Sequence, residues 1–381
     1  MTEKLYYKDV YIKEFDSVVI DVSSTDNGYD IILDKTAFFP EEGGQSSDTG
    51  YIGESEVISV YETDGVVHHI TLTDPGLGEK HCVLNFDERF EKMQCHTAEH
   101  MLCGIIHRLY GLENVGFHLN DREVVFDVDG ILDREQLDVV EELANAAVFA
   151  NIKVETEFPD SDKLSKIQYR AKLEMTEGVR LVTIDGVDIC ACCAPHVGYT
   201  GEIGIIKILD FMKHRGGTRI TMVAGKRAML DYRARYENVK RISGMLSVPH
   251  PDTADAVGAM LSQNEALRGE LKQARLRIAE MCAQSIDPGS EDRVFLFSDF
   301  TVPELIAFSN AASMRSESIL VALSGCEGDY KYVITSKDEG LYTRAKEINS
   351  ALSGRGGGRA NMIQGSFSCT IEEIRKFFNQ K

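Results

Sequence analysis

Hydrophobic and polar positions alternate along the first 86 residues. Short β-prone runs such as SVVIDVSS, YDIILD, EVISVYE and VVHHITL are separated by turn-forming clusters, among them STDNGYD and TDPGLGE. Alternation with a period of two residues, interrupted by short turns, is typical of an antiparallel sheet or a small barrel. We therefore expect a β-barrel-like domain over residues 1–86.

The pattern changes at Arg89 to the 3.6-residue period of a helix, which should end at Gly111. Strands and helices then alternate as far as the segment TRITMVAG, so we expect an α+β domain over residues 87–225. The expected strands are EVVFDVDG, NIKVETEF and the segment that starts VRLVTIDGVDICACC, and the expected helices lie at about 133–150 and 160–173.

Residues 226–285 have the pattern of two helices, interrupted at SVPHPDT, where the prolines cannot continue a helix. Four heptads in the second helix predict a coiled coil or a tight helical hairpin, whose partner is the preceding helix or a second chain in a homodimer. An amphipathic helix packed on a globular core is the alternative. The a positions are Val257, Asn264, Leu271 and Ile278, and the d positions are Met260, Leu267, Ala274 and Met281.

The last segment, residues 286–381, predicts a small α/β domain. Its strands are RVFLFSDF, SILVALSG and KYVITS, with helices at about 303–314 and 341–352. The segment GRGGGRANMIQG, near the end of the chain, is expected to be a glycine-rich loop. The whole chain is therefore predicted to be α+β, in four parts.

Composition narrows the class of protein. With 43% hydrophobic and 27% charged residues in 381, the chain is globular rather than disordered or collagen-like. It contains no apolar run long enough to span a membrane, and the first residues do not resemble a signal peptide. Nine cysteines, three of them within four residues, favour free thiols or a metal site over a disulfide framework. We expect a cytoplasmic protein.

Charge is unevenly distributed. The chain carries 41 basic and 61 acidic residues, a net charge of −20, which argues against coating nucleic acid by bulk attraction. Residues 213–241 nevertheless carry nine basic side chains and two acidic ones. This basic stripe could contact the phosphates of a nucleic acid, and the alternative is a solvated helix face. The stripe consists of Lys213, Arg215, Arg219, Lys226, Arg227, Arg233, Arg235, Lys240 and Arg241.

Two short motifs carry candidate metal ligands. In HTAEH, His96 and His100 are four residues apart, which places both rings on one face of a helix. The motif differs from the HExxH of zinc proteases, because Thr97 stands where the base is expected and Glu99 comes two positions later.

The second motif, CACCAPHVGYTGEIG, adds Cys192 and His196. One thiolate and three imidazoles are suited to Zn2+, although Cys193, Cys190 and Cys95 remain alternative thiols. Four retained protein ligands would make the zinc structural, whereas catalysis requires an open position.

Four segments, in order and spacing, resemble the editing domain and C-terminal domain of alanyl-tRNA synthetases and the free-standing AlaX-type editing proteins. They are TAFFPEEGGQSSDTG (36–50), HTAEH (96–100), CCAPHVGYTGEIG (192–204) and SGRGGGRANMIQG (353–365). The resemblance implies hydrolysis of the ester that joins serine or glycine to alanine tRNA. It also implies that His96, His100, Cys192 and His196 hold zinc.

The resemblance further assigns roles to residues outside the metal set. Gln45 matches a residue beside the substrate, and Thr36 matches a position whose hydroxyl meets the serine side chain. In the family, the glycine-rich domain contacts tRNA, so the resemblance implies that Arg355 and Arg359, with Gly356, Gly357 and Gly358 between them, bind tRNA; exposed arginines beside a turn are the alternative. In the basic stripe, the candidate tRNA-binding residues are Lys213, Arg215 and Arg219, on charge alone.

The chain also departs from the family pattern. The usual C-x-G-T-H is C-C-A-P-H here, so a hydroxyl is missing and Pro195 removes a backbone N–H before His196. Glu42 adds a negative charge where many relatives have glycine or serine. No segment resembles the ATP-binding aminoacylation domain, so no ligase activity is expected.

The sequence therefore predicts a zinc-dependent hydrolase that deacylates mischarged alanine tRNA. Two alternatives remain open at this stage. One is a non-catalytic tRNA-binding protein with a structural zinc, and the other is a zinc hydrolase acting on a small ester or amide.

Overall fold

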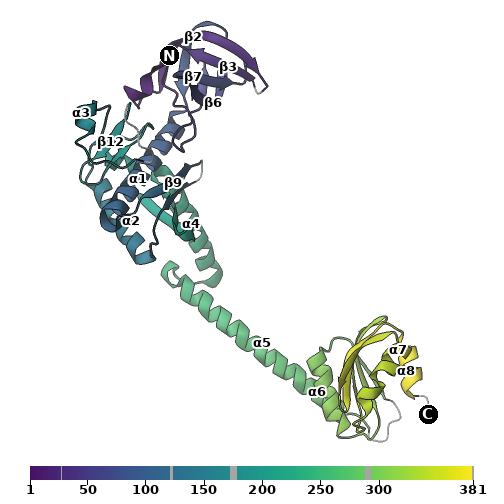
Figure 1. Cartoon of the computed structure of the whole chain (residues 1–381). Coiled ribbons are helices and arrows are strands. Elements are labelled where there is room, and N and C mark those ends of the chain that lie inside the picture. The colour runs from purple at the N-terminus through teal and green to yellow at the C-terminus, as the bar shows by residue number, and fades with distance from the viewer. Residues whose placement is uncertain (27, 121–122, 172–177, 288–292, 380–381) are drawn as a thin grey trace. The chain divides into compact units, whose positions relative to one another are not determined.

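The structure, a computed structural model, describes residues 1–26, 28–120, 123–171, 178–287 and 293–379 (Figure 1). The chain divides into two compact units, Met1–Lys240 and Arg241–Lys381. The predicted α+β class is confirmed, since the described residues form several β-sheets and eight α-helices. The finer division into four parts stays a prediction.

Six strands of the first unit pair into a closed barrel in the order β2-β3-β7-β6-β5-β8. Side chains that alternate along these strands fill the interior, among them Val19, Ile31 and Val57. The strands are β2 (Glu14–Thr25), β3 (Gly28–Leu33), β5 (Gly50–Ile52), β6 (Ser55–Thr63), β7 (Val66–Thr71) and β8 (Gly78–Leu84). A short pair, β1 (Glu3–Lys4) with β4 (Lys35–Thr36), lies outside the barrel.

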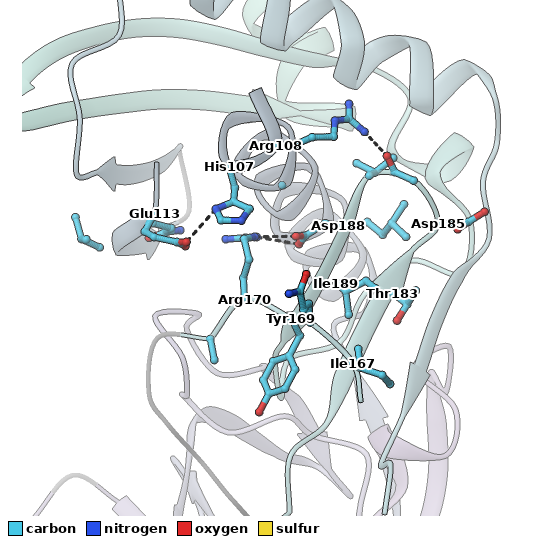
Figure 2. A pocket seen from close by; sticks show the side chains of 18 residues that line it. His107, Arg108, Glu113, Ile167, Tyr169, Arg170, Thr183, Asp185, Asp188 and Ile189 are labelled. Carbon is cyan, nitrogen blue, oxygen red and sulfur yellow. Dashed lines mark hydrogen bonds and ion pairs between the residues drawn. The ribbon is translucent and has the colours of Figure 1, made fainter. Parts of the chain in front are cut away.

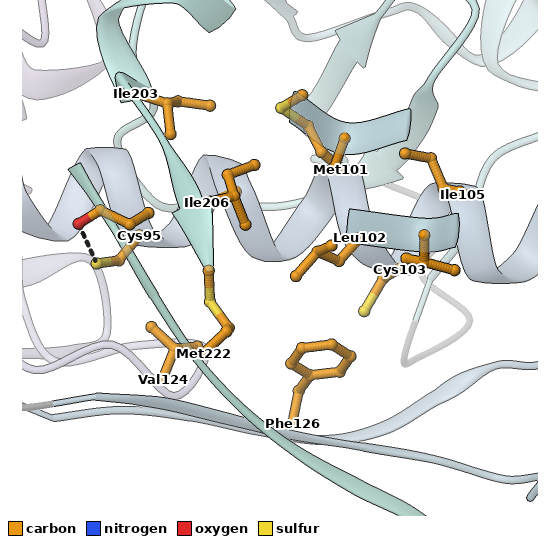
Figure 3. Packing of buried hydrophobic residues seen from close by; sticks show 14 of the residues in the cluster. Cys95, Met101, Leu102, Cys103, Ile105, Val124, Phe126, Ile203, Ile206 and Met222 are labelled. Carbon is orange, nitrogen blue, oxygen red and sulfur yellow. Dashed lines mark hydrogen bonds between the residues drawn. The ribbon is translucent and has the colours of Figure 1, made fainter. Parts of the chain in front are cut away.

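A long helix, α1 (Phe86–Tyr110), follows the barrel and ends at Gly111, whose φ of 68° suits glycine. Its apolar side packs against a four-stranded antiparallel sheet in the order β14-β15-β10-β9. Figure 3 shows Leu102 of the helix facing Phe126 and Met222 of this sheet. The strands are β9 (Asn114–Leu119), β10 (Val124–Val128), β14 (Ile206–His214) and β15 (Gly217–Ala224).

The chain between β10 and β14 forms a second sheet, of three strands. It is formed by β11 (Val154–Glu157), β12 (Leu181–Ile184) and β13 (Asp188–Ala191), after helix α2 (Arg134–Phe149), which begins with a capping box at Asp133. The helix expected at about 160–173 is wrong in length: α3 (Ser161–Leu164) has a single turn, and residues 172–177 lie outside the described part. Arg170 instead hydrogen-bonds alongside β13, to the backbones of Ile189 and Ala191.

The second unit is built on a five-stranded sheet in the order β16-β17-β18-β20-β19. The strands are β16 (Val294–Phe297), β17 (Leu320–Cys326), β18 (Asp329–Thr335), β19 (Gly354–Arg359) and β20 (Met362–Phe367), and the helices of this part are α6 (Val302–Ser313), α7 (Ala345–Ala351) and α8 (Ile371–Asn379). Helices α4 (Gly225–Leu246) and α5 (Thr253–Gln284) precede them, separated where the prolines were expected to break the helix.

The glycine-rich segment is not a loop, which corrects the sequence-based expectation. Its residues Gly354–Arg359 form the edge strand β19, paired in register with β20. A Cβ on Gly356 would lie 2.3 Å from the carbonyl oxygen of Gln364 and 2.6 Å from the hydroxyl of Tyr332. The glycines therefore permit a close cross-strand approach under an aromatic ring, which local turn propensity does not reveal.

The heptad positions of α5 are largely exposed. Leu267, Leu271 and Ile278 are 54%, 61% and 51% exposed, whereas Ala279 and Ala283 are buried against α6. The coiled coil and the homodimer stay predictions. No helix in the described part of the chain is both long and apolar enough to cross a membrane.

Candidate metal centre

Four side chains from two distant segments converge in the first unit. His96 and His100 stand one turn apart on α1, and Cys192 and His196 follow strand β13. One donor atom from each of the four lies within 4.8 Å of all the others. Sγ of Cys192 is 3.6 Å from Nε2 of His96 and 3.4 Å from Nε2 of His196.

These distances fit a tetrahedral ion. Zinc ligand bonds of about 2.0–2.1 Å to nitrogen and about 2.3 Å to sulfur place neighbouring donors about 3.5 Å apart. The donor set of one thiol and three imidazoles also suits zinc. The four residues therefore fit Zn2+ in both geometry and chemistry.

Gln45 supports the first histidine. Its side chain is fully buried, and Oε1 lies 2.8 Å from Nδ1 of His96. Accepting that proton leaves Nε2 of His96 directed at Cys192. The loop that carries Gln45 passes close to β9, where a Cβ on Gly44 would lie 2.6 Å from the carbonyl oxygen of Phe117. Glycine permits this approach because it has no Cβ, and it also suits the φ of +87° at this position.

Thr97 supports the histidine of the second motif. Its hydroxyl donates to the carbonyl of Met93 at 2.8 Å and lies 3.1 Å from Nδ1 of His196. It also accepts from the backbone N–H of Val197 at 3.3 Å. The residue between the two histidines of HTAEH thus supplies a hydroxyl to this site.

Asp188 lies behind His100. Its Oδ2 is 3.2 Å from Nδ1 of His100, close but not aligned for a hydrogen bond. Two bonds from Arg170, of 2.7 and 2.8 Å, hold the carboxylate from the other side. Gly104 lets α1 approach this strand, since a Cβ there would lie 2.6 Å from Cβ of Asp188.

Arg180 braces the segment that carries the cysteine. Its guanidinium donates to the carbonyls of Cys192 at 3.0 Å and Ala194 at 2.8 Å, while the N–H of Cys192 donates to the carbonyl of Arg180. These bonds hold the turn in which Pro195 has removed a donor. Sequence reasoning missed Asp188, Arg170 and Arg180. Asp188 begins β13, and backbone hydrogen bonds to β13 and to Cys192 bring Arg170 and Arg180 to the ligands.

The electrostatics of the four donors differ. Burial raises the pKa of the Cys192 thiol, but the charge of His96 and bonds from the other histidines outweigh it, so the pKa lies well below its usual value. Burial lowers the pKa of His196 to about 3. Burial also lowers the pKa of His100, but the charge of Cys190 and the contact with Asp188 together raise it well above its usual value. A thiolate and a neutral His196 are the states that bind a metal, whereas His100 would release a proton on binding.

One cavity adjoins the donors, and a second lies next to it. One, of about 330 Å³, is lined by His96, His100 and Cys192 together with Glu99 and Arg180. The other, of about 1160 Å³, is an open groove of mixed polar and apolar lining between α1 and the β12–β13 sheet (Figure 2). They share Glu113, Asn114, Arg170 and Ala171 as lining residues, so the groove and the smaller cavity are neighbours.

The other predicted residues lie in different surroundings. Thr36 is fully buried beside the barrel, where its hydroxyl lies 2.8 Å from Nε2 of His69, and it does not line the smaller cavity. Of the alternative thiols, Cys95 is buried in the core, Cys193 lines the smaller cavity, and Cys190 joins His100 and Asp188 in a second group of donors.

Much of the basic stripe is neutralised within the chain. Arg219 binds Asp127 through bonds of 2.7 and 2.8 Å, and Lys226 and Arg227 pair with Glu91. In the second unit, Arg355 and Arg359 are exposed on one face of β19, on either side of Gly357. Neither forms an ion pair with another described residue.

Comparisons with known proteins identify a matching domain and relatives similar along most of the chain. Residues 179–228 match the family model for the threonyl and alanyl tRNA synthetase second additional domain. The chain is 27% identical to alanyl-tRNA editing protein AlaX-L of Pyrococcus horikoshii, over 98% of this chain and 96% of that protein. It is 30% identical to alanine–tRNA ligase of Halorubrum lacusprofundi over 94% of this chain, spanning about 40% of the ligase.

A solved structure is also similar: the C-Ala domain of Aquifex aeolicus alanyl-tRNA synthetase, at 21% identity with a TM-score of 0.21. The match covers 23% of this chain and 86% of that domain. The full-length match to AlaX-L and the domain match around Cys192 and His196 confirm the resemblance predicted from the four motifs. The chain is thus similar, along almost its whole length, to the AlaX-type alanyl-tRNA editing proteins.

Proposed function

We propose that this chain is a zinc-dependent editing hydrolase that removes serine or glycine from mischarged alanine tRNA. The observation that carries the proposal is the convergence of four donors beside an accessible cavity. His96, His100 and Cys192 line that cavity, and His196 completes the set of donors. A purely structural zinc would need no such cavity. Relatives named as an alanyl-tRNA editing protein and as alanine–tRNA ligases support the substrate class.

The four donors would hold the ion, and their neighbours would keep them in place. If one of the four positions around the ion opens, bound zinc would supply Lewis acidity, either to polarise an ester carbonyl or to lower the pKa of a water. Gln45 and Thr97 orient the rings of His96 and His196, and Asp188 faces His100. Phe117, stacked 4.7 Å from the ring of His96, covers one side of the site with apolar surface.

The two cavities suit the two parts of the substrate. About 330 Å³ is at the lower end of the range for small-molecule sites, which suits an aminoacyl end. The larger groove would receive the adjoining nucleotides of the tRNA. Farther along the tRNA, we propose contacts from Lys213, Arg215 and Arg219 and from the strand that carries Arg355, Gly356, Gly357, Gly358 and Arg359. Phosphate contacts of this kind should weaken as salt rises.

The decisive experiment compares release of serine and alanine from alanine tRNA, using native protein and His100→Ala. We expect metal-dependent release of serine, little release of alanine, and loss of activity in the variant. Zinc-loaded protein that binds the tRNA without releasing serine would instead be a binding protein. Turnover of simple esters without salt-sensitive tRNA binding would indicate a small-molecule hydrolase.

A further inference from the structure

Glu99 is a buried carboxylate in the cavity beside the metal donors. It is 4% exposed and lies three residues after His96 and one before His100 on α1. Positions separated by three and four residues share a helix face, so Glu99 stands on the side that carries the two histidines. It lines the same cavity of about 330 Å³.

The partners of Glu99 are neutral. Oε1 accepts from the amide of Asn114 and from the thiol of Cys103, the latter at 3.1 Å. In the part of the chain that the structure describes, Oε2 has no hydrogen-bond partner and no Lys, Arg or His forms an ion pair with Glu99. A buried carboxylate without a countercharge is unfavourable, so this one is suited to receive a cation.

The other charged groups around the cavity are already engaged or exposed. Arg170 is bound to Asp188, Arg180 donates to backbone carbonyls, and Glu113 lies 2.9 Å from His107. Glu42 is exposed at the edge. Among the described residues that line this cavity, Glu99 is therefore the buried acid that is left for a ligand. The described residues contain two groups of side chains that could hold a metal ion, and Glu99 belongs to neither. A second metal ion is therefore not the ligand that we favour for Glu99.

We propose that Glu99 binds the α-ammonium group of the aminoacyl ester, so that the cavity accepts aminoacyl ends and rejects acyl ends that lack the amine. The inference rests on the proposed editing function, because that function supplies an aminoacyl ester. An ammonium group is compact, carries three N–H donors and matches a carboxylate whose second oxygen is unpaired. Glu99 is thus a specificity-determining residue, placed beside the metal donors by the helix that carries them.

The test measures binding without catalysis. Two analogues of 3′-amino-3′-deoxyadenosine, one acylated with L-serine and one with 3-hydroxypropanoic acid, differ only in the α-ammonium group. We expect zinc-loaded native protein to prefer the seryl analogue by about 10- to 100-fold, as expected for a charge-assisted hydrogen bond. Glu99→Gln should reduce the preference to less than about threefold. Glu142→Gln, which removes an exposed carboxylate from α2, should retain it.

Each outcome decides the inference. Equal binding of the two analogues by native protein, or no binding of either, would overturn it whatever the variant does. A preference that persists in Glu99→Gln would assign the ammonium to another group. Loss of zinc from the variant would be detected as an altered Co2+ absorption spectrum, and the native comparison would then decide alone. Serine release from tRNA tests the editing function separately, so that function can hold while equal binding of the analogues excludes the role of Glu99.

Discussion

Oγ1 of Thr97 lies 3.1 Å from Nδ1 of His196, and the same hydroxyl donates its proton to the carbonyl of Met93. A hydroxyl has a single proton to donate, so it must accept from Nδ1–H of His196. That bond sets the tautomer of the ring and leaves Nε2 facing Cys192 at 3.4 Å. The C-C-A-P-H motif itself lacks a threonine hydroxyl. Thr97 on α1 supplies a hydroxyl to His196 instead.

Removing this hydroxyl should weaken metal binding. Thr97→Val keeps the shape of the side chain but leaves Nδ1–H of His196 without its acceptor, and we expect zinc affinity to fall about 10- to 100-fold. Thr97→Ser, which keeps a hydroxyl, should stay within a few-fold of native protein. Competition with a chromophoric chelator measures both constants, and equal affinities for native protein and Thr97→Val would contradict the assignment.

Removing the metal should destabilise the protein. Zinc that binds the folded state alone stabilises it by about 2.7 kcal/mol when free zinc is 100 times its dissociation constant. We expect dialysis against a chelator to lower the midpoint of thermal unfolding, and zinc to restore it. In Cys192→Ser the chelator should have a much smaller effect, because a thiolate ligand is missing. An unchanged midpoint for native protein after verified zinc removal would exclude this linkage.

Stability should fall in mild acid because of His69. Burial lowers the pKa of His69 to about 4, from about 6.5 in an unfolded chain. Between these values the unfolded chain binds more protons than the folded one, so stability is lost as pH falls from 6.5 to 4, by up to about 3 kcal/mol. Urea unfolding across this range should show a smaller decline for His69→Gln than for native protein. His118→Gln, at an exposed position, should decline like native protein.

Two glycine-to-alanine changes in helices should have opposite effects. In α1, the new Cβ of Gly104→Ala would lie 2.5 Å from the carbonyl oxygen of Val187, so β13 must shift and the free energy of unfolding should fall by about 1–3 kcal/mol. In α5, Gly269→Ala meets no atom within 4 Å and should stabilise by up to about 1 kcal/mol. Chemical denaturation measures both. Since β13 carries Asp188, only the first change should also weaken metal binding.

Much of the secondary structure could be predicted from local sequence. Helix α1 was expected from the spacing of its apolar residues and its end from Gly111, and both are confirmed. Two expectations failed where non-local contacts prevail over local propensity. Gly354–Arg359 became a strand because its glycines fit against β20 and Tyr332, and the segment around Arg170 became extended because it pairs with β13.

Sequence spacing was sufficient to nominate His96, His100 and His196 as metal donors, together with one thiol of the same short motif as His196. The choice of Cys192 among the candidate thiols came from the family resemblance. The groups around them could not be nominated in this way. Asp188, Arg170 and Arg180 reach the donors through strand pairing, and Gln45 arrives on a loop 51 residues from the histidine it contacts. Hydrogen bonds and buried charge act over a few ångströms in space, whatever the distance along the chain. The side chains that support the site therefore depend on how the sheets and α1 pack together. The same holds for the carboxylate of Glu99, which forms no ion pair with another described residue.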